Sequence, residues 1–198
     1  MVMSKMPALI RLLFAPLAMA AASAIAAPPS APGSAGGLAD PLSIRQIKMV
    51  FGFGEVGQPR KTFGADQPIA GFGATIYYSG AGTLIGRWEV VRPGEALPSA
   101  LHTVPEYEIP GTERGSLTKY KVVDTFIESL PASGRHFLTG PDPAKLPRDL
   151  PGTYRVLLRI ESISSVTIRN PPQAGLSIPI LQYTIQGVKP VAEKKSGQ

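Results

Sequence analysis

His102, Glu106 and Glu108 are the residues whose types and spacing come closest to a metal site in this sequence. On an extended strand the three side chains would point to one face, because successive side chains alternate between the two faces of a sheet. One imidazole and two carboxylates could then hold a divalent cation weakly. The spacing does not match the paired histidines of a helical zinc motif, and it supplies no third strong ligand. It therefore favours a solvated polar face, and we predict no metal and no other cofactor.

A hydrolytic site has still less support. Ser133, His136 and Asp142 supply a nucleophile, a base and an acid, but no local motif orients the three side chains. The sequence has no Gly-x-Ser-x-Gly elbow and no cysteine nucleophile. Its acidic residues are scattered rather than paired as in glycosidases. We therefore predict that the protein is not an enzyme, and a hydrolase is the least favoured class of function.

The stretch Gly52-Phe53-Gly54-Glu55-Val56-Gly57 imitates the glycine-rich fingerprint of dinucleotide-binding proteins. It follows a strand-like run, as the fingerprint does. No helical pattern comes after it, and in that motif the helix N-terminus is what binds the pyrophosphate. The stretch therefore predicts a glycine-rich hairpin turn.

The first 26 residues have the pattern of a secretory signal peptide. Lys5 and Arg11 supply positive charge, an apolar run follows over 12–22, and Ala24-Ile25-Ala26 suits signal peptidase. The apolar run is shorter than the about 20 residues that span a bilayer. We therefore predict a signal peptide over 1–26, a periplasmic or secreted protein, and no membrane insertion after cleavage.

Composition narrows the range of partners. The sequence has no cysteine, so a hydrophobic core without disulfides must hold an exported domain together. Its formal net charge is +6, and the signal peptide carries two of the 20 basic residues. The remaining mild positive charge suits weak attraction to anionic envelope polymers. It is far from the signature of a nucleic-acid-binding protein, so we predict no nucleic-acid partner.

Residues 42–188 carry short strand-like runs separated by glycine and proline. A flexible Pro/Gly/Ala leader over 27–41 precedes them, and a disordered tail over 189–198 follows. This pattern predicts an all-β domain, a single immunoglobulin-like antiparallel β-sandwich of about seven or eight strands. Residues 125–129 could instead form one helical turn, and the proline-rich stretch 143–151 must be a loop. The expected strands are 44–53, 68–78, 84–92, 102–109, 117–130, 135–139, 150–160 and 178–187.

Two aromatic residues indicate how such a sandwich is filled. Trp88, the only tryptophan, lies in a strand whose alternate residues are apolar, so its indole is expected between the two sheets. Tyr154 follows Gly152 at the start of a strand, as in the tyrosine corner of immunoglobulin-like sandwiches. Gly71 and Gly73, inside another strand, suggest a bulge or the close approach of a second backbone.

Three stretches together carry a family resemblance: the strand 68–78 with 80–90 and its Gly-x-Trp-x-Val pattern, Leu138-Thr139-Gly140-Pro141, and 146–156 with its Gly-x-Tyr-x-Val pattern. They resemble a family of exported proteobacterial proteins of unassigned function with an immunoglobulin-like or fibronectin-III-like β-sandwich. The resemblance covers roughly residues 42–187. It implies a sandwich fold and an envelope location, and it brings no catalytic motif. The chain departs from true immunoglobulin domains in lacking their paired cysteines.

Strand parity also predicts a face of mixed charge. If the Trp88 strand pairs with the Tyr154 strand, and that strand pairs with the last one, one outer sheet face collects arginine, glutamate and aliphatic residues. Such a mixture is typical of a protein-binding patch. Cross-strand Arg–Glu pairs with shielding aliphatic side chains are the other explanation, and the sequence favours it. The face comprises Arg87, Glu89, Arg155, Leu157, Arg159, Glu161, Ile178, Ile180 and Gln182, of which Arg87, Glu89, Arg155, Leu157, Arg159 and Ile180 are the candidate binding residues.

The sequence therefore favours a non-enzymatic, exported interaction or accessory module of the bacterial cell envelope, which contacts an envelope protein through a sheet face or edge. A carbohydrate- or glycan-binding module is the alternative. Its support is the set of aromatic side chains that could stack on sugars, Tyr77, Tyr107 and Tyr120.

Overall fold

The computed structural model describes residues 40–52, 56–132, 134–165 and 167–187. All of them belong to one compact unit, Gly37–Gln198. The predicted signal peptide (1–26) and tail (189–198) lie outside the described residues. Of the predicted leader, only Asp40 and Pro41 are described, and Pro41 already forms a bridge with Ala81.

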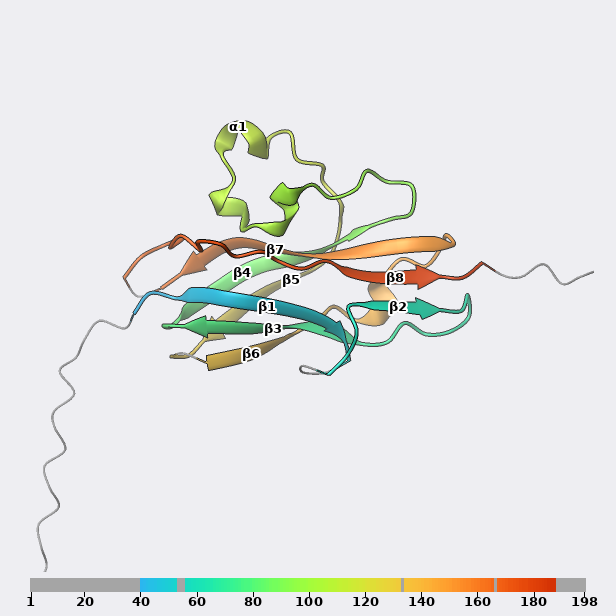
Figure 1. Cartoon of the computed structure of the whole chain (residues 1–198), viewed down its shortest axis with the longest axis horizontal. Helices are drawn as coiled ribbons and strands as arrows, with labels where there is room; N and C mark the ends of the chain where they lie inside the picture. Colours follow the sequence, from blue (N-terminus) through green and yellow to red (C-terminus); the bar gives the residue numbers. More distant parts are fainter. Residues whose placement is uncertain (1–39, 53–55, 133, 166, 188–198) are drawn as a thin grey trace, which may run out of the picture. The chain divides into compact units, whose positions relative to one another are not determined.

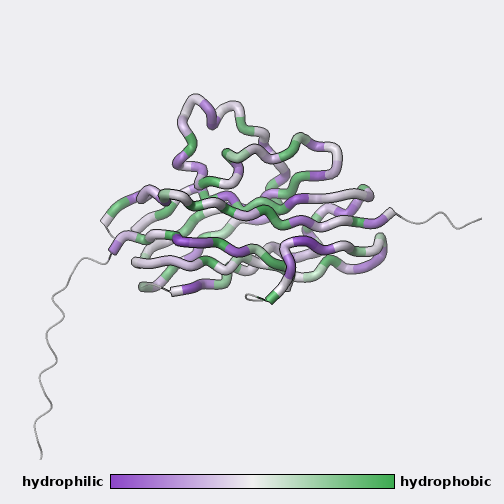
Figure 2. Tube along the Cα trace, in the orientation of Figure 1, coloured by the Kyte–Doolittle hydropathy of each residue, from purple (hydrophilic) through white to green (hydrophobic). Residues whose placement is uncertain are grey.

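The described chain is strand-rich, and its eight strands form two sheets (Figure 1). Three strands form the small sheet, in the order β1-β3-β6, and five form the large sheet, in the order β2-β8-β7-β4-β5. Hydrophilic and hydrophobic residues alternate along the strands (Figure 2), as expected when one sheet face packs on a core. The strands are β1 Ser43–Phe51, β2 Arg60–Phe63, β3 Phe72–Ser79, β4 Gly82–Val91, β5 Lys121–Leu130, β6 Gly134–Thr139, β7 Gly152–Ser164 and β8 Leu181–Ile185.

This strand order is that of an immunoglobulin-like sandwich, as predicted. Strands β1, β3 and β6 take the positions of A, B and E, and β4, β5, β7 and β8 take those of C, C′, F and G. The Trp88 strand pairs with the Tyr154 strand, and that strand pairs with β8. The pairings of the named strands are antiparallel with one exception, β2 with β8, which is parallel.

Trp88 and Tyr154 lie between the sheets, which confirms the central prediction. Trp88 is 1% exposed and Tyr154 is fully buried. The indole of Trp88 meets the ring of Phe72 from the small sheet edge-on, with 5.5 Å between the ring centroids. The Tyr154 hydroxyl donates to the carbonyl of Leu150 and accepts from its N–H, each at 2.9 Å. This is the tyrosine corner, and it fixes the turn into β7.

Gly73 marks a close approach rather than a bulge, because β3 pairs with β1 and with β6 through this residue without a shift of register. A Cβ atom at Gly73 would lie 2.4 Å from Cζ of Phe137 and 2.6 Å from the carbonyl oxygen of Leu138. The ring of Phe137 therefore occupies the space that a side chain at position 73 would need. Of the two outcomes the sequence left open for this glycine, the structure gives close approach.

Two details of the strand prediction are wrong. Residues 102–109 are not a strand but lie across two 3₁₀ helices, η1 Ala100–Thr103 and η2 Glu106–Glu108, which precede the short helix α1 Gly111–Arg114. The strand predicted at 117–130 is confirmed as β5, and residues 125–129 belong to it rather than to the helical turn that the sequence left as an alternative. Strand β2 was missed. The stretch 143–151 is a loop as predicted, apart from the short helix η3 Pro143–Lys145.

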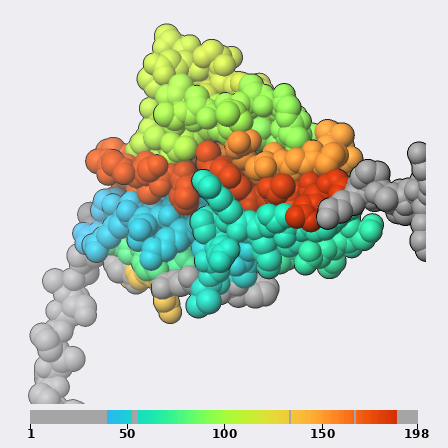
Figure 3. Space-filling view, turned by 45° about the vertical axis from the view of Figure 1, so that its right-hand side comes forward, coloured from blue at the N-terminus to red at the C-terminus, as the bar shows by residue number. Residues whose placement is uncertain are grey.

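Residues 92–120, here called the cover segment, connect β4 to β5. The segment lies on the large sheet, on the side away from the small sheet (Figure 1), and forms a raised lobe against the chain after residue 150 (Figure 3). Its prolines explain why it is not a strand, because a proline has no N–H to donate to a ladder. They recur at Pro93, Pro98, Pro105 and Pro110.

Candidate functional site

The strand pairing behind the contact face predicted from parity is confirmed, but a large part of that face is covered. Register places Arg87 opposite Arg159, and Glu89 opposite Leu157, on one side of the large sheet. Glu89, Leu157 and Arg159 are only 4%, 1% and 2% exposed. The cover segment lies over them, so these three residues are not exposed on an outer surface as a contact patch would require. Their role in binding a partner stays a prediction, as does that of Arg155 and Ile180.

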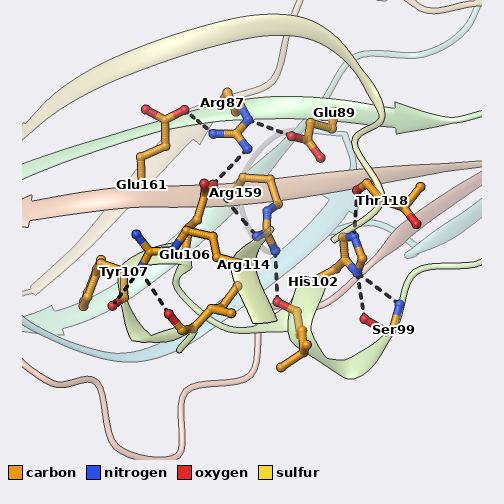
Figure 4. Close-up of polar contacts among 12 residues, drawn as sticks. Arg87, Glu89, Ser99, His102, Glu106, Tyr107, Arg114, Thr118, Arg159 and Glu161 are labelled. Carbon is orange, nitrogen blue, oxygen red and sulfur yellow. Dashed lines mark hydrogen bonds and ion pairs between the residues drawn. The ribbon is translucent and has the colours of Figure 1, made fainter. Parts of the chain in front are cut away.

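The covered face holds a charge cluster, which comprises Arg87, Glu89, Glu106, Arg159 and Glu161 (Figure 4). Two arginines directly opposite each other on neighbouring strands would repel. Three carboxylates offset this repulsion. Glu89 and Glu161 come from β4 and β7 themselves, whereas Glu106 comes from η2 in the cover segment.

Arg87 is the centre of the cluster. Its Nε donates to Glu89 Oε1 at 2.6 Å, its Nη1 donates to Glu161, and its Nη2 lies 2.8 Å from Glu106 Oε2. Burial alone would lower the pKa of Arg87, but the hydrogen bonds to Glu161 and Glu89 and the charge of Glu106 outweigh it and raise the pKa. Glu89 and Glu161 thus accept hydrogen bonds from this guanidinium, and Glu106 pairs with it by charge.

Arg159 ties the sheet to the cover segment. Its Nη1 donates to the carbonyl oxygen of Leu101 at 3.2 Å, and its Nη2 lies 3.9 Å from Glu106 Oε2. Burial lowers the pKa of Arg159, and the charges of Glu89 and Glu106 only partly oppose that effect. The group stays charged, because an arginine side chain does not lose its proton in proteins. Its burial is therefore tolerated only while the carboxylates remain in place.

His102 is a structural residue of the cover segment rather than a ligand. Its Nδ1 accepts from the N–H of Ser99 at 3.1 Å, so the proton is on Nε2, which donates to the carbonyl of Thr118 at 3.1 Å. Its ring packs on Tyr120, with 5.2 Å between centroids. Both ring nitrogens thus hold the two ends of the segment together.

The acidic residues near His102 point elsewhere. Glu106 belongs to the charge cluster, and Glu108 accepts from the N–H of Gln173. In the described residues, no group of three or more His, Cys, Asp or Glu side chains could hold a metal ion. A cavity of about 40 Å³ remains between the cluster and the cover segment, which is room for roughly one or two water molecules.

The residues considered for a hydrolytic site do not form such a site among the described residues. His136 Nε2 lies 3.2 Å from Glu128 Oε2, a contact between the edges of the two sheets. Asp142 accepts from the N–H of Ala144 and caps η3. Ser133 lies outside the described residues. Ser116 and Lys119 have Ser-x-x-Lys spacing, but the Ser116 hydroxyl donates to the carbonyl of Glu113 at 2.8 Å.

The three tyrosines considered for sugar binding differ in position. The Tyr107 hydroxyl donates to the carbonyl of Pro171, and the Tyr120 hydroxyl donates to that of Ala96. Tyr120 is only 7% exposed. Tyr77 lies on the small sheet, and its ring has the ammonium group of Lys48 above it, 5.2 Å from the centroid. Only Tyr77 of the three lies on a sheet face without the cover segment.

The edge of the large sheet is a feature that sequence reasoning missed. Strand β5 has one strand neighbour, β4, and runs for ten residues. Its outward side chains include Val122 and Ile127, which are 47% and 72% exposed. The alternation of side chains between the two sheet faces along 121–130 could have predicted these exposed apolar residues. That β5 is an edge follows only from the complete strand order.

None of the helices in the described residues has the length and apolar character needed to cross a bilayer. No protein-family model matches the chain, and no curated protein matches it. The family resemblance stated from the sequence stays a prediction.

Proposed function

We propose that this protein is a non-enzymatic, exported β-sandwich that binds another protein of the bacterial envelope by pairing an extended segment of that protein with β5. One observation carries the proposal. Strand β5 is a ten-residue edge strand whose Ile127 side chain is 72% exposed. A long edge with exposed apolar side chains is a template for strand addition.

The two edges of the large sheet differ in how they are protected. Strand β2, at one edge, has four residues and carries Arg60 and Lys61. Short length and positive charge both discourage pairing with another chain. Strand β5 has one register shift, beside Asp124, and then pairs with β4 without interruption over 125–130. Glu128 is the one charged residue in that regular part.

An added strand would gain main-chain hydrogen bonds along β5 and side-chain contacts at its outer face. Ile127 and Ile85 lie opposite each other in the β4–β5 ladder, and Val122 lies opposite Glu89. A partner strand would place its own side chains against Ile127 and Val122. Main-chain bonds then supply affinity, and these apolar contacts supply specificity.

Two further observations support a binding role over catalysis. Both nitrogens of His102 are bonded within the cover segment. Glu89, Glu106 and Glu161 are ion-paired to Arg87, so none is poised as a general acid or base. Export rests on the pattern of the first 26 residues alone.

A photo-crosslinking residue placed at position 127 of the full chain tests the proposal in living bacteria. We expect one discrete protein adduct, with the crosslink mapping to one short segment of the partner. The same residue placed at Leu97, an apolar side chain of the cover segment that is 65% exposed, is the control and should give no such adduct. Identical adduct patterns from 127 and 97, or none from 127, would contradict strand addition at β5.

A further inference from the structure

The outer face of the large sheet carries two arginines in one row at the edge formed by β2. Strands β2 and β8 run side by side in the same direction (Figure 1). The row reads Arg60 on β2, Gln182 on β8 and Arg155 on β7. Residues directly opposite each other on neighbouring strands point to the same face. The two arginines therefore flank Gln182 on the side away from the core, into which Tyr154 and Tyr183 point.

Neither arginine has a carboxylate partner in the part of the chain that the structure describes. The ion pairs that form there involve other side chains. Strand β2, strand β8 and the first five residues of β7, GTYRV, contain no aspartate or glutamate. Lys61 adds a third cation at this edge, with its ammonium group 5.6 Å from the ring centroid of Phe63. Cations that are not neutralised by their neighbours attract anions.

A shallow depression lies in this part of the sheet. It encloses about 420 Å³, and ligand sites in proteins have volumes of about 300–1,000 Å³. The row next to the arginines reads Thr62, Thr184, Thr153, and the hydroxyl oxygens of the last two are 3.0 Å apart. Besides these threonines, the lining consists of Gln58, Arg60, Lys61 and Gln182. We call the arginine row and this depression the β2 site.

A phosphate monoester matches the β2 site better than a carboxylate does. Near neutral pH its charge is about −1.5 to −2, which two guanidinium groups offset, whereas a carboxylate carries a single charge. The planar fork of a guanidinium also matches two oxygens of a phosphate. The Cα atoms of Arg60 and Arg155 are two strand spacings apart, about 10 Å, so both side chains can reach one phosphate above Gln182. Hydroxyl and amide groups both donate and accept hydrogen bonds, as the hydroxyls of a sugar require.

We propose that the β2 site binds a sugar that carries a phosphate monoester. Arg60 and Arg155 bind the phosphate oxygens, and the amide of Gln182 donates to the same group from between them. The threonine hydroxyls exchange hydrogen bonds with the sugar hydroxyls. A protein partner would need an apolar centre, which this lining lacks. The β2 site and strand β5 are at opposite edges of the large sheet, so this inference does not depend on strand addition at β5.

Titration of the isotope-labelled, purified chain with glucose 6-phosphate, followed by NMR, tests this inference. We expect saturable shifts of the backbone amide signals of β2, β8 and the start of β7, with a dissociation constant of about 1 mM or lower. Glucose lacks the phosphate, glucuronate replaces it with a carboxylate, and inorganic phosphate lacks the sugar. Each of these three should bind at least about tenfold more weakly.

Arg60→Gln and Arg155→Gln should each weaken the binding by about tenfold, because one of the two guanidinium forks is lost. Thr184→Val keeps the shape of the side chain without its hydroxyl and should weaken it by about threefold. Arg45→Gln is the control, since Arg45 is an exposed arginine of the small sheet, and it should change the dissociation constant by less than about twofold. Emission from Trp88, the only tryptophan, reports whether each variant is folded. The exposed Arg60 carries the test if Arg155→Gln is not.

Vesicles that contain a lipid with a phosphorylated glucosamine headgroup distinguish two sources of the same chemistry. Binding to glucose 6-phosphate without binding to the vesicles identifies a soluble sugar phosphate, and binding to the vesicles that Arg60→Gln weakens identifies a headgroup. Four results would overturn the inference: no binding to either the ester or the vesicles, equal binding of glucuronate or of inorganic phosphate, equal losses from Arg45→Gln and Arg60→Gln, or tighter binding to single-stranded DNA.

Discussion

The outer faces of the two sheets carry arginines in similar positions and use them in opposite ways. On the large sheet, Arg87 and Arg159 alternate with Glu89 and Glu161 along β4 and β7, and the cover segment packs on top of them. On the small sheet, Arg45 and Lys48 of β1 are exposed, and β1 contains no acidic residue. The presence of acids two residues away is what allows the first set to be buried, because a buried charge must be paired.

The difference shows that an outer sheet face with both positive and negative side chains is not necessarily exposed to solvent. Its charges can be satisfied within the chain by one additional carboxylate, here that of Glu106 from the cover segment. A face whose charges all have one sign cannot be neutralised by its own strands, so it needs a counter-charge from another part of the chain or from outside.

Removal of Arg159 should lower the stability of the protein more than the other substitutions considered below. Arg159→Ala leaves Glu89 and Glu106 with one guanidinium fewer beneath the cover segment, and we expect a loss of about 3–5 kcal/mol in the free energy of unfolding. Arg45→Ala, on the small sheet, should change it by less than about 0.5 kcal/mol. Urea unfolding followed by Trp88 fluorescence measures both. Equal effects would show that the covered arginine is not held as described.

The small sheet should be most sensitive at Gly73 rather than at a charge. Gly73→Ala places a Cβ atom against the ring of Phe137 and the carbonyl of Leu138. We expect a loss of about 1–3 kcal/mol in the free energy of unfolding from overpacking. Gly115→Ala is the control, since a Cβ at Gly115 meets nothing within 4 Å. A neutral Gly73→Ala would mean that the Phe137 ring moves freely.

The sequence pattern correctly predicted side-chain directions that depend only on the alternation of apolar and polar residues within one strand. Trp88 and Tyr154 point inward because alternate residues of their strands are apolar, and Arg87 and Arg159 share the opposite face for the same reason. Whether that face is solvated does not depend on β4 or β7. It depends on a separate segment, 92–120, that folds back over it.

Two elements escaped prediction for different physical reasons. Strand β2 has four residues, of which Phe63 alone is apolar, and it is stabilised by parallel pairing with β8, about 120 residues later in the chain. The cover segment carries a proline every five to seven residues, at Pro93, Pro98, Pro105 and Pro110. That spacing is the signal that could have excluded a strand at 102–109.

Glu106 tests whether the cover segment is held by charge. It is the member of the charge cluster that comes from this segment, so Glu106→Gln removes the ionic tie to the sheet and leaves the shape unchanged. Because Glu106 is partly exposed, we expect only about 1 kcal/mol of local destabilisation, seen as about fivefold faster amide exchange around η1 and η2. Glu113→Gln, in the exposed helix α1, should leave exchange unchanged. Equal exchange in both variants would show that apolar contacts alone hold the segment.

Alkaline pH should weaken the half of the molecule around the large sheet first. Among the described residues, the tyrosines with a clearly raised pKa are Tyr107, Tyr120, Tyr154 and Tyr183, all in the cover segment or the large sheet. Burial raises the pKa of Tyr154 and of Tyr183 because the phenolate cannot be hydrated. Their neutral forms therefore stabilise the fold below the unfolded pKa, and this contribution falls as pH rises toward the folded values.

Each of the two buried tyrosines should cost about 0.4 kcal/mol of stability at pH 10, where the unfolded chain begins to ionise them. Urea unfolding between pH 8 and pH 10.5 measures the decline, and Tyr183→Phe should make it shallower. Amide exchange at pH 10 should rise in β7 and β8 before it rises in β1 and β3, because the small sheet contains none of these four residues. A simultaneous rise in both sheets would show that the two faces, although different in charge, belong to one unit of unfolding.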